Sequence, residues 1–514
     1  MGGQGGLLQL VALGKQDVFL TGNPQMTWFK MVYRRYTNFA IESQPMYFDG
    51  TPDFGKRITC LVPRRGDLLS QIILEVTLPA LYLNSNPLTP TVPGDPVSYV
   101  DSIGHALIQE ISIEIGEQEV DRQNGEWMEI WSSYTTTSDK LDGFKNMIGK
   151  GDGFPSNGYP IDASGQKFYI PLRFWFCKNP GMALPLIALQ YHPVRINLTL
   201  RPLNQLYYSP NLTTTLCTTL DIAPAKITSL MMWGDYVYLD VEERRRFVSS
   251  AHEYLIEQVQ YTAPLPVAPG ASSATLTMEF NHPIREIFWY IQRDDMIRYH
   301  EYFNYSSVGA NEHGLVRVDM LQDAVLKFDG FDRFAARDAG YFRLVQPWQH
   351  HTTIPDEWYL YSYSFALRPE DSQPSGSVNA SRIDSIVLQV NLNPAFVTPP
   401  SVTTGTFSLN VFTSGLYNLS LSTDPGAIPT AGAMISGTGI LNGTMILSYN
   451  AGTKTIIINN PTTAAGGGAG VVANYITQTA SSTCISGTLH SRIYAINHNV
   501  FRVADGFGGV LFTI

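Results

Sequence analysis

Alternation of apolar and polar residues is the dominant pattern along the chain. In Ile72–Leu78 positions 72, 74, 76 and 78 are all apolar, and Val194–Arg201 repeats this arrangement more cleanly. The same spacing recurs in residues 111–115, 276–280 and 386–392. A period of two predicts strands with one buried and one solvated face, and such strands form antiparallel sheets packed in layers. The pattern therefore predicts an all-β protein built as a sandwich or a barrel.

Helical signals are few and short. Asn124 is a candidate N-cap for an amphipathic helix that includes Trp127 and Trp131. Asp240 is a candidate N-cap for a second helix over residues 241–250. We expect these helices to connect strands and not to form the body of the fold.

The strand pattern occurs twice along the chain. Residues 113–121 are predicted to form a strand, a tight turn and an apolar return before a short helix, and residues 326–334 show the same order. Residues 168–176 and 358–367 are each followed by a connection and then by another alternating strand. Repetition at a fixed distance indicates a duplicated unit. Two tandem copies of one β-sandwich fit this pattern better than one large domain.

The repeat suggests a division of the chain into four parts. We expect an N-terminal arm over residues 1–25, a first sandwich over 26–238, a helical linker over 239–251 and a second sandwich over 252–514. The second sandwich contains an inserted module at about residues 402–484.

The composition of this insertion differs from the rest of the chain. Between residues 394 and 490 the only charged residues are Asp424 and Lys454, and Thr, Ser, Gly, Ala and Asn dominate. Short strands separated by Gly and Asn predict a small all-β module at a loop tip that points into solvent. A flexible linker is the alternative. The isoleucine run in Thr455–Asn459 argues against a linker, because such a run is prone to aggregation when it is left unpaired.

Composition and charge narrow the class of protein further. The chain is 44% hydrophobic and only 15% charged, with 43 Gly, 32 Pro and 27 Tyr, which is typical of a turn-rich β protein. Lys and Arg total 34 against 44 Asp and Glu, so the formal net charge is −10. A general nucleic-acid binder needs a basic surface. We therefore expect no sequence-specific contact with nucleic acid.

The cysteines and the apolar segments indicate neither a metal nor a membrane span. Cys60, Cys177, Cys217 and Cys484 are far apart and form no zinc-binding pattern, so we expect buried free thiols. No apolar stretch reaches the length of about 18 residues that a membrane-spanning helix needs. The N-terminus lacks the basic and long apolar regions of a signal peptide.

Two local patterns resemble catalytic or cofactor sites only in part. Gly50–Lys56 matches the first part of a phosphate-binding loop, but Arg57 replaces the magnesium-binding Ser or Thr and a strand follows instead of a helix. We interpret it as a turn.

The only local cluster of histidine and carboxylate is His350–His351 with Asp356 and Glu357. Adjacent strand residues point to opposite faces, so the imidazoles cannot easily share a metal, and a surface loop pair is expected. We expect no catalytic residue, no metal and no cofactor.

Two basic clusters are candidates for binding surfaces. Arg244–Arg246 follows two glutamates on the predicted linker helix, where mixed charge favours a solvated face. Trp28, Lys30, Arg34 and Arg35 interleave aromatic and basic residues near the N-terminus. This segment suits a nucleic-acid or lipid-facing patch, and packing between chains is an equal alternative.

Several long ungapped runs carry a specific resemblance. They resemble the major capsid proteins of nucleocytoplasmic large DNA viruses, and they span nearly the whole chain except the insertion. The runs are Gly6–Ser43, Phe168–Leu172, Pro180–His192, His252–Gln258, Gln373–Gly376, Ser381–Asp384 and Tyr494–Gly509.

The resemblance implies a double jelly roll of two eight-stranded sandwiches with short connecting helices. It implies homotrimeric, pseudo-hexameric capsomers that tile the icosahedral shell of a virion assembled in the host cytoplasm. The implied partners are neighbouring capsomers, minor capsid and penton proteins, and an internal membrane reached through minor proteins. By the same analogy, Trp28–Tyr36 lies at the inner base of the capsomer. The insertion lies on the outer face and is longer than the loop expected there.

A carbohydrate-binding β protein is the alternative from another functional class. Loops of jelly rolls that are rich in Trp and Tyr can stack on sugars. The capsid hypothesis and the carbohydrate-binding hypothesis are compatible if the insertion contacts a host-surface glycan. A hydrolase or a metal-binding cupin is disfavoured because neither nucleophile elbow nor His-x-His is present.

Overall fold

The structure is a computed structural model in which the chain separates into two units, Met1–Ala40 and Ile41–Ile514. The first unit contains helices α1 (Gln4–Val11) and α2 (Val18–Thr21). The residues that the structure describes are 4–25, 35–81, 98–151, 159, 161, 165–208, 224–268, 271–298, 300–309, 317–355, 358–393, 402–408, 416, 418–420, 434–436, 446–450, 453–458, 472–478 and 488–512.

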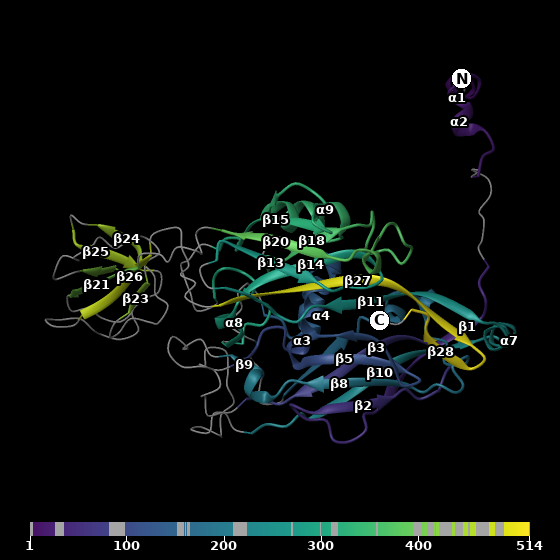
Figure 1. Cartoon of the computed structure of the whole chain (residues 1–514), viewed down its shortest axis with the longest axis horizontal. Coiled ribbons are helices and arrows are strands. Elements are labelled where there is room, and N and C mark those ends of the chain that lie inside the picture. The colour runs from purple at the N-terminus through teal and green to yellow at the C-terminus, as the bar shows by residue number, and fades with distance from the viewer. Residues whose placement is uncertain are drawn as a thin grey trace. The chain divides into compact units, whose positions relative to one another are not determined.

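Two four-stranded antiparallel sheets form the first sandwich (Figure 1). One sheet contains, in spatial order, β1 (Phe39–Met46), β10 (Ser229–Leu239), β3 (Leu68–Leu78) and β7 (Gln166–Pro171). The other contains β2 (Arg57–Leu61), β8 (Val194–Leu200), β5 (Ile108–Ile115) and β6 (Gln118–Gln123). A short ladder joins β4 (Ser98–Tyr99) to β9 (Tyr207–Tyr208).

The second sandwich repeats this arrangement. One sheet contains β11 (His252–Tyr261), β27 (Leu489–Ala504), β14 (Pro283–Arg293) and β18 (Tyr361–Ser364). The other contains β13 (Ser273–Met278), β20 (Ile386–Leu392), β15 (Leu321–Phe328) and β16 (Phe331–Asp332). Short strands extend these sheets: β12 (Leu265–Val267), β17 (Arg337–Asp338), β19 (Val378–Asn379) and β28 (Phe507–Val510).

Both sandwiches have the same topology. When the eight main strands of each are numbered in chain order, both have sheets of order 1-8-3-6 and 2-7-4-5. This order is that of a jelly roll, so the predicted all-β double jelly roll is confirmed. The hairpins in which the sequence repeat was recognised, β5–β6 and β15–β16, occupy the same place in both copies.

The turns of these hairpins share their backbone conformation. Gly116 and Glu117 have φ of 60° and 68°, and Asp329 and Gly330 have φ of 50° and 84°. Two successive residues with positive φ form the two-residue turn that matches the twist of antiparallel strands. The turn chemistry of each copy therefore fixes the register of its hairpin.

Each sandwich has its own core of apolar side chains. On β20 every second residue from Ile386 to Leu392 is buried, as the alternation predicts. On β3 the apolar positions are buried too, but Glu75 on the other face is only 7% exposed. Trp233 donates to the Glu75 carboxylate and Lys167 pairs with it, so this face is covered where solvent was expected.

Short helices connect the strands, as expected. Asn124 caps α4, and the helix predicted after Asp240 forms as α7 without a side-chain cap bond. The helices of this unit are α3 (Ile103–Leu107), α4 (Gly125–Thr135), α5 (Ser138–Ile148), α6 (Trp175–Lys178), α7 (Val241–Ser249), α8 (Asp294–Arg298) and α9 (Gln346–His350). Shorter helical turns are η1 (Pro180–Met182), η2 (Leu203–Gln205), η4 (Tyr341–Val345) and η6 (Ala380–Arg382).

The insertion between β20 and β27 contains paired strands. One sheet has the order β21 (Val402–Ser408), β26 (Val472–Gln478), β23 (Met434–Ser436). The other has the order β22 (Asn418–Ser420), β25 (Thr455–Ile458), β24 (Ile446–Asn450). The isoleucine run lies on the central strand β25, where Ile456 and Ile458 are buried. A flexible linker is therefore excluded for these strands.

Candidate functional site

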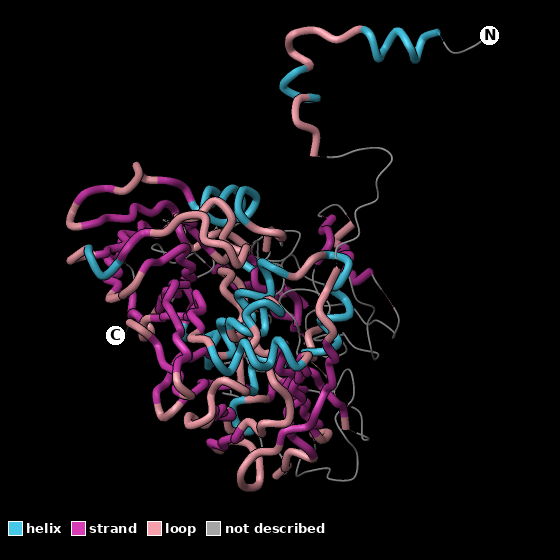
Figure 2. Tube along the Cα trace, turned by 90° about the vertical axis from the view of Figure 1, so that its right-hand side faces the viewer, coloured by secondary structure: helices cyan, strands magenta, loops and turns pink. Residues whose placement is uncertain are grey.

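The junction between the two sandwiches is formed by the outer face of one sheet. Strands β14 and β27 of the second sandwich are buried on both faces, so alternate side chains enter different cores. On β14, Trp289 lies in the core of its own sandwich, whereas Phe288 and Tyr290 lie in a separate aromatic cluster with Trp127 and Trp131 of α4. Helical segments gather between the strands of the two sandwiches (Figure 2).

Helix α4 joins the junction at its first turn. The Asn124 side-chain oxygen accepts a hydrogen bond from the Trp127 backbone N–H at 2.8 Å, which caps the helix. Its amide nitrogen donates to the Tyr494 hydroxyl on β27 at 3.1 Å. One side chain therefore both starts the helix and attaches it to the other sandwich.

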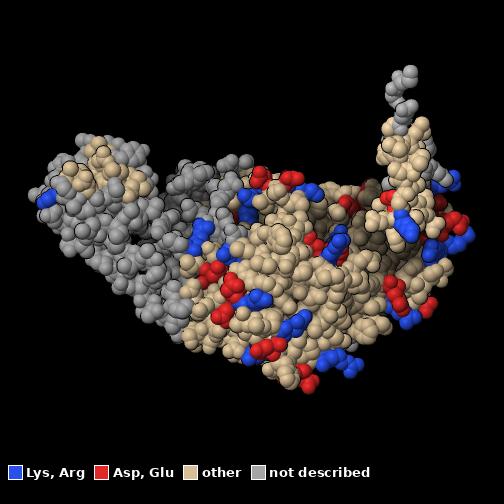
Figure 3. Space-filling view, turned by 90° about the horizontal axis from the view of Figure 1, so that it is seen from above, with Lys and Arg blue, Asp and Glu red and all other residues tan. Residues whose placement is uncertain are grey.

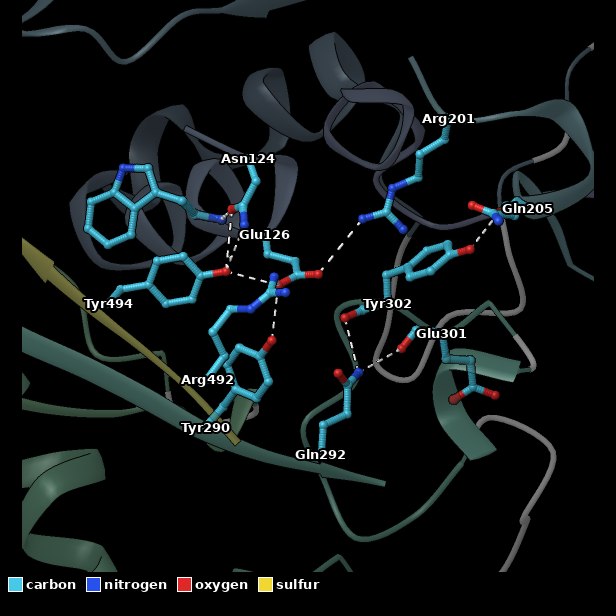
Figure 4. A network of polar contacts seen from close by, with 11 residues as sticks. Asn124, Glu126, Arg201, Gln205, Tyr290, Gln292, Glu301, Tyr302, Arg492 and Tyr494 are labelled. Carbon is cyan, nitrogen blue, oxygen red and sulfur yellow. Dashed lines mark hydrogen bonds and ion pairs between the residues drawn. The ribbon is translucent and has the colours of Figure 1, made fainter. Parts of the chain in front are cut away.

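The Glu126 carboxylate is the centre of a polar network in the junction (Figure 4). Arg492 of β27 lies 2.6 Å from Glu126 Oε2, and the hydroxyls of Tyr290 and Tyr494 donate to the same oxygen at 3.0 and 2.9 Å. Arg201, which follows β8, lies 3.8 Å from Oε1. The carboxylate thus binds groups from both sandwiches.

The network keeps its central carboxyl ionised. Burial by itself raises the pKa of Glu126, but the guanidinium groups of Arg492 and Arg201 lower it, and the net shift is downward. Burial also raises the pKa of Tyr290 and Tyr494 well above the ordinary value, so both phenols stay protonated and act as donors. A buried charge that is paired and hydrogen-bonded in this way specifies geometry, because its removal leaves the partner charge uncompensated.

A second contact extends the network beside Arg201 (Figure 4). The Arg201 guanidinium lies 4.0 Å from the centre of the Tyr302 ring, a cation–π distance. The Tyr302 hydroxyl donates to the Gln205 carbonyl at 2.9 Å. On the other side, Gln292 of β14 donates to the carbonyls of Glu301 and Tyr302 at 3.2 and 3.0 Å, which fixes this segment within the second sandwich.

A third contact is a partly buried ion triplet. Lys178 of α6 lies 3.1 Å from both carboxylate oxygens of Glu257 on β11. Arg285 of β14 binds the same two oxygens at 2.5 and 3.0 Å. Burial raises the pKa of Glu257, but Arg285 and Lys178 lower it. Together the two cations outweigh burial, so the net shift of the pKa is downward.

The histidine predicted to form a surface pair is buried in the junction. The side chain of His351 has no exposed area and lies between the carboxylates of Glu286 at 2.6 Å and Glu370 at 2.9 Å. Its ring packs 4.7 Å from that of Tyr134 on α4. Expecting a surface loop was therefore wrong for His351, because packing against α4 covers it. Asp356 and Glu357 lie outside the described residues.

The C-terminal hairpin attaches to the first sandwich. The backbone N–H of Tyr191 donates to the Gly506 carbonyl at 3.0 Å, and His192 Nδ1 lies 2.7 Å from the Gly508 carbonyl. Gly506 has φ of 86°, and a Cβ on it would lie 2.6 Å from the Tyr191 ring. The close approach of β28 therefore requires glycine at this turn.

Of the four N-terminal candidate residues, the structure describes only Arg35. Trp28, Lys30 and Arg34 lie outside the described residues, and Arg35 is exposed. In the same unit several apolar side chains of α1 and α2 are exposed, including Phe19 at 91%. Such exposure suits a segment that a partner covers.

The other sequence candidates are structural. The Gly50–Lys56 segment is a loop that leads into β2. Cys60 and Cys177 are free thiols, and burial raises the pKa of each to about 12, whereas Cys217 and Cys484 lie outside the described residues.

Surface charge and metal ligands offer no further site in the described part of the chain. Arg244 and Arg245 of α7 are more than half exposed, as expected for a solvated face. Figure 3 shows acidic and basic residues interspersed over one face of the described structure. Among the residues that are described, no three His, Cys, Asp or Glu side chains are placed to bind a metal, and no helix is long and apolar enough to cross a membrane.

The junction fixes one sandwich relative to the other. Its charged residues were missed by sequence reasoning, because a glutamate in the first turn of a helix is usually solvated. The family-like runs do include Glu257 and Tyr494, and these runs are the signal that could have pointed to the junction. Chemically the arrangement holds two β domains in one orientation.

Comparison with known proteins agrees with this architecture. The family described as "Major capsid protein N-terminus" matches residues 27–240, and "Large eukaryotic DNA virus major capsid protein" matches residues 243–423. The major capsid protein of Phaeocystis pouchetii virus is 35% identical, over 76% of this chain and 94% of that protein. That of Pyramimonas orientalis virus is 38% identical, over 75% and 91%.

Solved structures show the same fold. The chain matches the PBCV-1 virus capsid quasi-atomic model with a TM-score of 0.65 and 27% identity, over 95% of this chain and 100% of that chain. The Faustovirus major capsid protein matches with a TM-score of 0.58 over 96% and 94%, and at 12% identity this likeness concerns the fold alone. These relatives are structural proteins and not enzymes. The chain belongs to the family of major capsid proteins of large eukaryotic DNA viruses.

Proposed function

We propose that three copies of this chain form a pseudo-hexameric capsomer, and that such capsomers tile the icosahedral shell of a large double-stranded DNA virus. In this assembly residues 26–238 and 252–514 supply two of six similar corners, and residues 239–251 link them. The shell forms in the host cytoplasm, and its other components are minor capsid and penton proteins.

The observation that carries this proposal is the Glu126 network between two sandwiches of equal topology. A trimer can imitate a hexagon only if its two domains are similar and are held at a fixed angle. The equal sheet orders supply the similarity. The charged and aromatic contacts of α4 with β14 and β27 supply the fixed angle.

The mass of the purified full-length chain in solution tests the proposal. Light scattering should give a species of about 171 kDa, three chains of 57.0 kDa, and negative-stain images should show a six-cornered outline. A well-behaved monomer of 57.0 kDa would contradict the trimer and favour the carbohydrate-binding alternative.

We further propose that the insertion, residues 402–484, lies on the outer face and contacts a host-surface glycan. Its place between β20 and β27, its own two sheets and its scarcity of charge support a separate exposed module. When a short Gly-Ser linker replaces it, the protein should still form a trimer, with three times the mass of the shortened chain. The replacement should abolish binding on a glycan array. A blank array with the intact protein would refute the glycan contact.

For Trp28, Lys30, Arg34 and Arg35 we propose a role at the inner face, near minor capsid proteins or the membrane that they contact. Exposure of Arg35 and of the apolar side chains in α1 and α2 supports this role. Changing the three basic residues to Gln should leave trimers intact but reduce the yield of complete shells. The matched control changes Arg244–Arg246 to Gln, which removes equal charge and should not affect the yield.

A further inference from the structure

A cavity of about 190 Å³ lies in the junction between the two sandwiches. Its walls come from both sides: β3, β6, α4 and the segment 171–178 of the first sandwich, and β11, β14 and β27 of the second. A cavity of about 150 Å³ is large enough for benzene, so this one accommodates a small organic molecule.

The charged groups that line this cavity do not balance. Three cations, Arg173, Lys178 and Arg285, line it together with one carboxylate, Glu257. Lys178 and Arg285 both bind Glu257, whereas Arg173 has no carboxylate partner among the described residues. Its guanidinium donates to the Ser132 hydroxyl at 3.3 Å and lies 5.7 Å from the centre of the Phe144 ring.

Several polar atoms on the cavity wall have no hydrogen-bond partner among the residues that the structure describes. They include Nε of Arg173, Nε of Arg285 and the side-chain oxygen of Gln123. Arg285 is 2% exposed and Gln123 is 1% exposed, so solvent does not satisfy these atoms freely. Burial also lowers the pKa of Arg173 and of Lys178. Buried polar groups without partners cost free energy, and an anion in the cavity would remove part of that cost.

The remaining wall of the cavity is apolar and aromatic. Trp127 and Trp131 stack with ring centres 5.6 Å apart, and Lys178 lies 5.5 Å from the centre of the Trp131 ring. Ile72 and Ile496 complete this wall from the two sandwiches. The cavity thus combines apolar and aromatic lining with an excess of positive charge.

Arg173 lines a second hollow as well as this cavity. A neighbouring groove is lined by Thr135–Thr137, Lys140, Phe144 and also by Arg173. Arg173 therefore borders both spaces. Lys140 adds a positive charge to the groove.

We propose that the junction cavity binds a small organic anion, a carboxylate on an aromatic or compact apolar body. The carboxylate pairs with Arg173 and the apolar body packs against the tryptophans. A donor group on the ligand reaches the unpartnered oxygen of Gln123. Because the walls belong to both sandwiches, the ligand stabilises their mutual orientation.

The test measures the thermal unfolding temperature of the full-length protein with 4-hydroxybenzoate, its neutral analogue 4-hydroxybenzamide, and inorganic phosphate. We expect a saturable rise of about 2–4 °C with about 10 mM 4-hydroxybenzoate, and smaller shifts with the other two compounds. Arg173→Met should abolish the shift and, without ligand, should unfold no earlier than the unaltered protein. If Arg173→Met does not fold, Lys178→Met serves as the second variant, and it should weaken the shift.

The control is Arg245→Met on α7, which should keep the full shift. An absent shift, or an equal shift in Arg173→Met, would refute the site. An equal shift with phosphate or with the neutral amide would refute an organic anion as its ligand. Each measurement compares a variant with and without ligand, so differences in basal stability do not affect the result.

Discussion

Arg492 on β27 donates to the Glu126 carboxylate on α4 at 2.6 Å, although 366 positions separate the two residues. This pair joins the last main strand of the second sandwich to the first sandwich. Two tyrosine hydroxyls complete the coordination of the carboxylate. The orientation of the two jelly rolls therefore depends on a few charged and phenolic groups within a larger aromatic contact.

Removing one member of this pair should be strongly destabilising. Arg492→Met leaves the Glu126 carboxylate, which is 16% exposed, with Arg201 at 3.8 Å as its one remaining cation among the described residues. We expect a loss of about 3–5 kcal/mol in the free energy of unfolding. Urea denaturation followed by tryptophan fluorescence measures it. The double variant Glu126→Leu/Arg492→Met should lose less than the sum of the single variants, whereas Arg245→Met should change stability by no more than about 0.5 kcal/mol. Equal losses in Arg245→Met and Arg492→Met would contradict this role.

The cap of α4 makes a separate prediction. Asn124→Ala removes both the cap bond to Trp127 and the bond to Tyr494, so a loss of about 1–2 kcal/mol is expected. Asn124→Ser keeps a capping oxygen, but the shorter side chain cannot reach both partners. The loss in the free energy of unfolding should therefore be intermediate for this variant. Both values come from the same denaturation experiment. If Asn124→Ala matched the unaltered protein, the cap would have no part in the junction.

Two glycines in equivalent turns form a matched pair of variants. Gly506 and Gly330 both follow an aspartate with positive φ, and their own φ values are 86° and 84°. A Cβ on Gly330 meets nothing within 4 Å, whereas one on Gly506 lies 2.6 Å from Tyr191. Gly330→Ala should cost only the backbone strain of about 1–2 kcal/mol.

Gly506→Ala should cost more than Gly330→Ala and should also release the C-terminal hairpin from the first sandwich. Limited proteolysis followed by mass spectrometry detects that release as earlier cleavage near β28. Identical cleavage patterns for the two variants would show that the hairpin does not depend on the contact with Tyr191.

The buried His351 predicts how stability changes with pH. Burial alone would lower its pKa, but the carboxylates of Glu286 and Glu370 raise it from 6.5 to about 9. Because the folded-state pKa lies above the unfolded value, the contribution is complete below pH 6.5 and is lost as pH rises through about 9. Its size is roughly 3 kcal/mol.

His351→Gln is the variant that isolates this contribution. At pH 6 it should be less stable than the unaltered protein, and the difference should shrink towards pH 9.5. Unfolding temperatures across this range measure both curves. Parallel curves would mean that the charge of His351 does not stabilise the junction.

Sequence patterns predicted the elements whose signals are local. The alternation in β20 gives the faces that are buried, and Asn124 with the following tryptophans gives α4. The two hairpin turns were recognised because glycine beside a polar residue is the local requirement of such a turn. The pairing of these elements within each jelly roll followed from the resemblance and from the repeat.

The polar junction could not be predicted in the same way. Glu75 and His351 have the sequence surroundings of exposed residues, yet remote residues cover both: Trp233 for Glu75 and the α4 side chain of Tyr134 for His351. Periodicity reports which face of one element is apolar. It does not report which second element will cover the polar face.

The sequence by itself determined two tandem jelly rolls, the inserted β module and the family of capsid proteins. These properties depend on period-two alternation, turn residues and runs of family-like sequence. Each of these signals is local, because it is contained in one continuous stretch of the chain. Only the tertiary structure decided that Glu126, Glu257 and His351 form the junction, and that Arg173 borders a cavity without a carboxylate partner among the described residues. The reason is that the burial and pairing of a charge depend on atoms from other elements of the fold, which lie from 28 positions away for Glu257 and Arg285 to 366 positions away for Glu126 and Arg492.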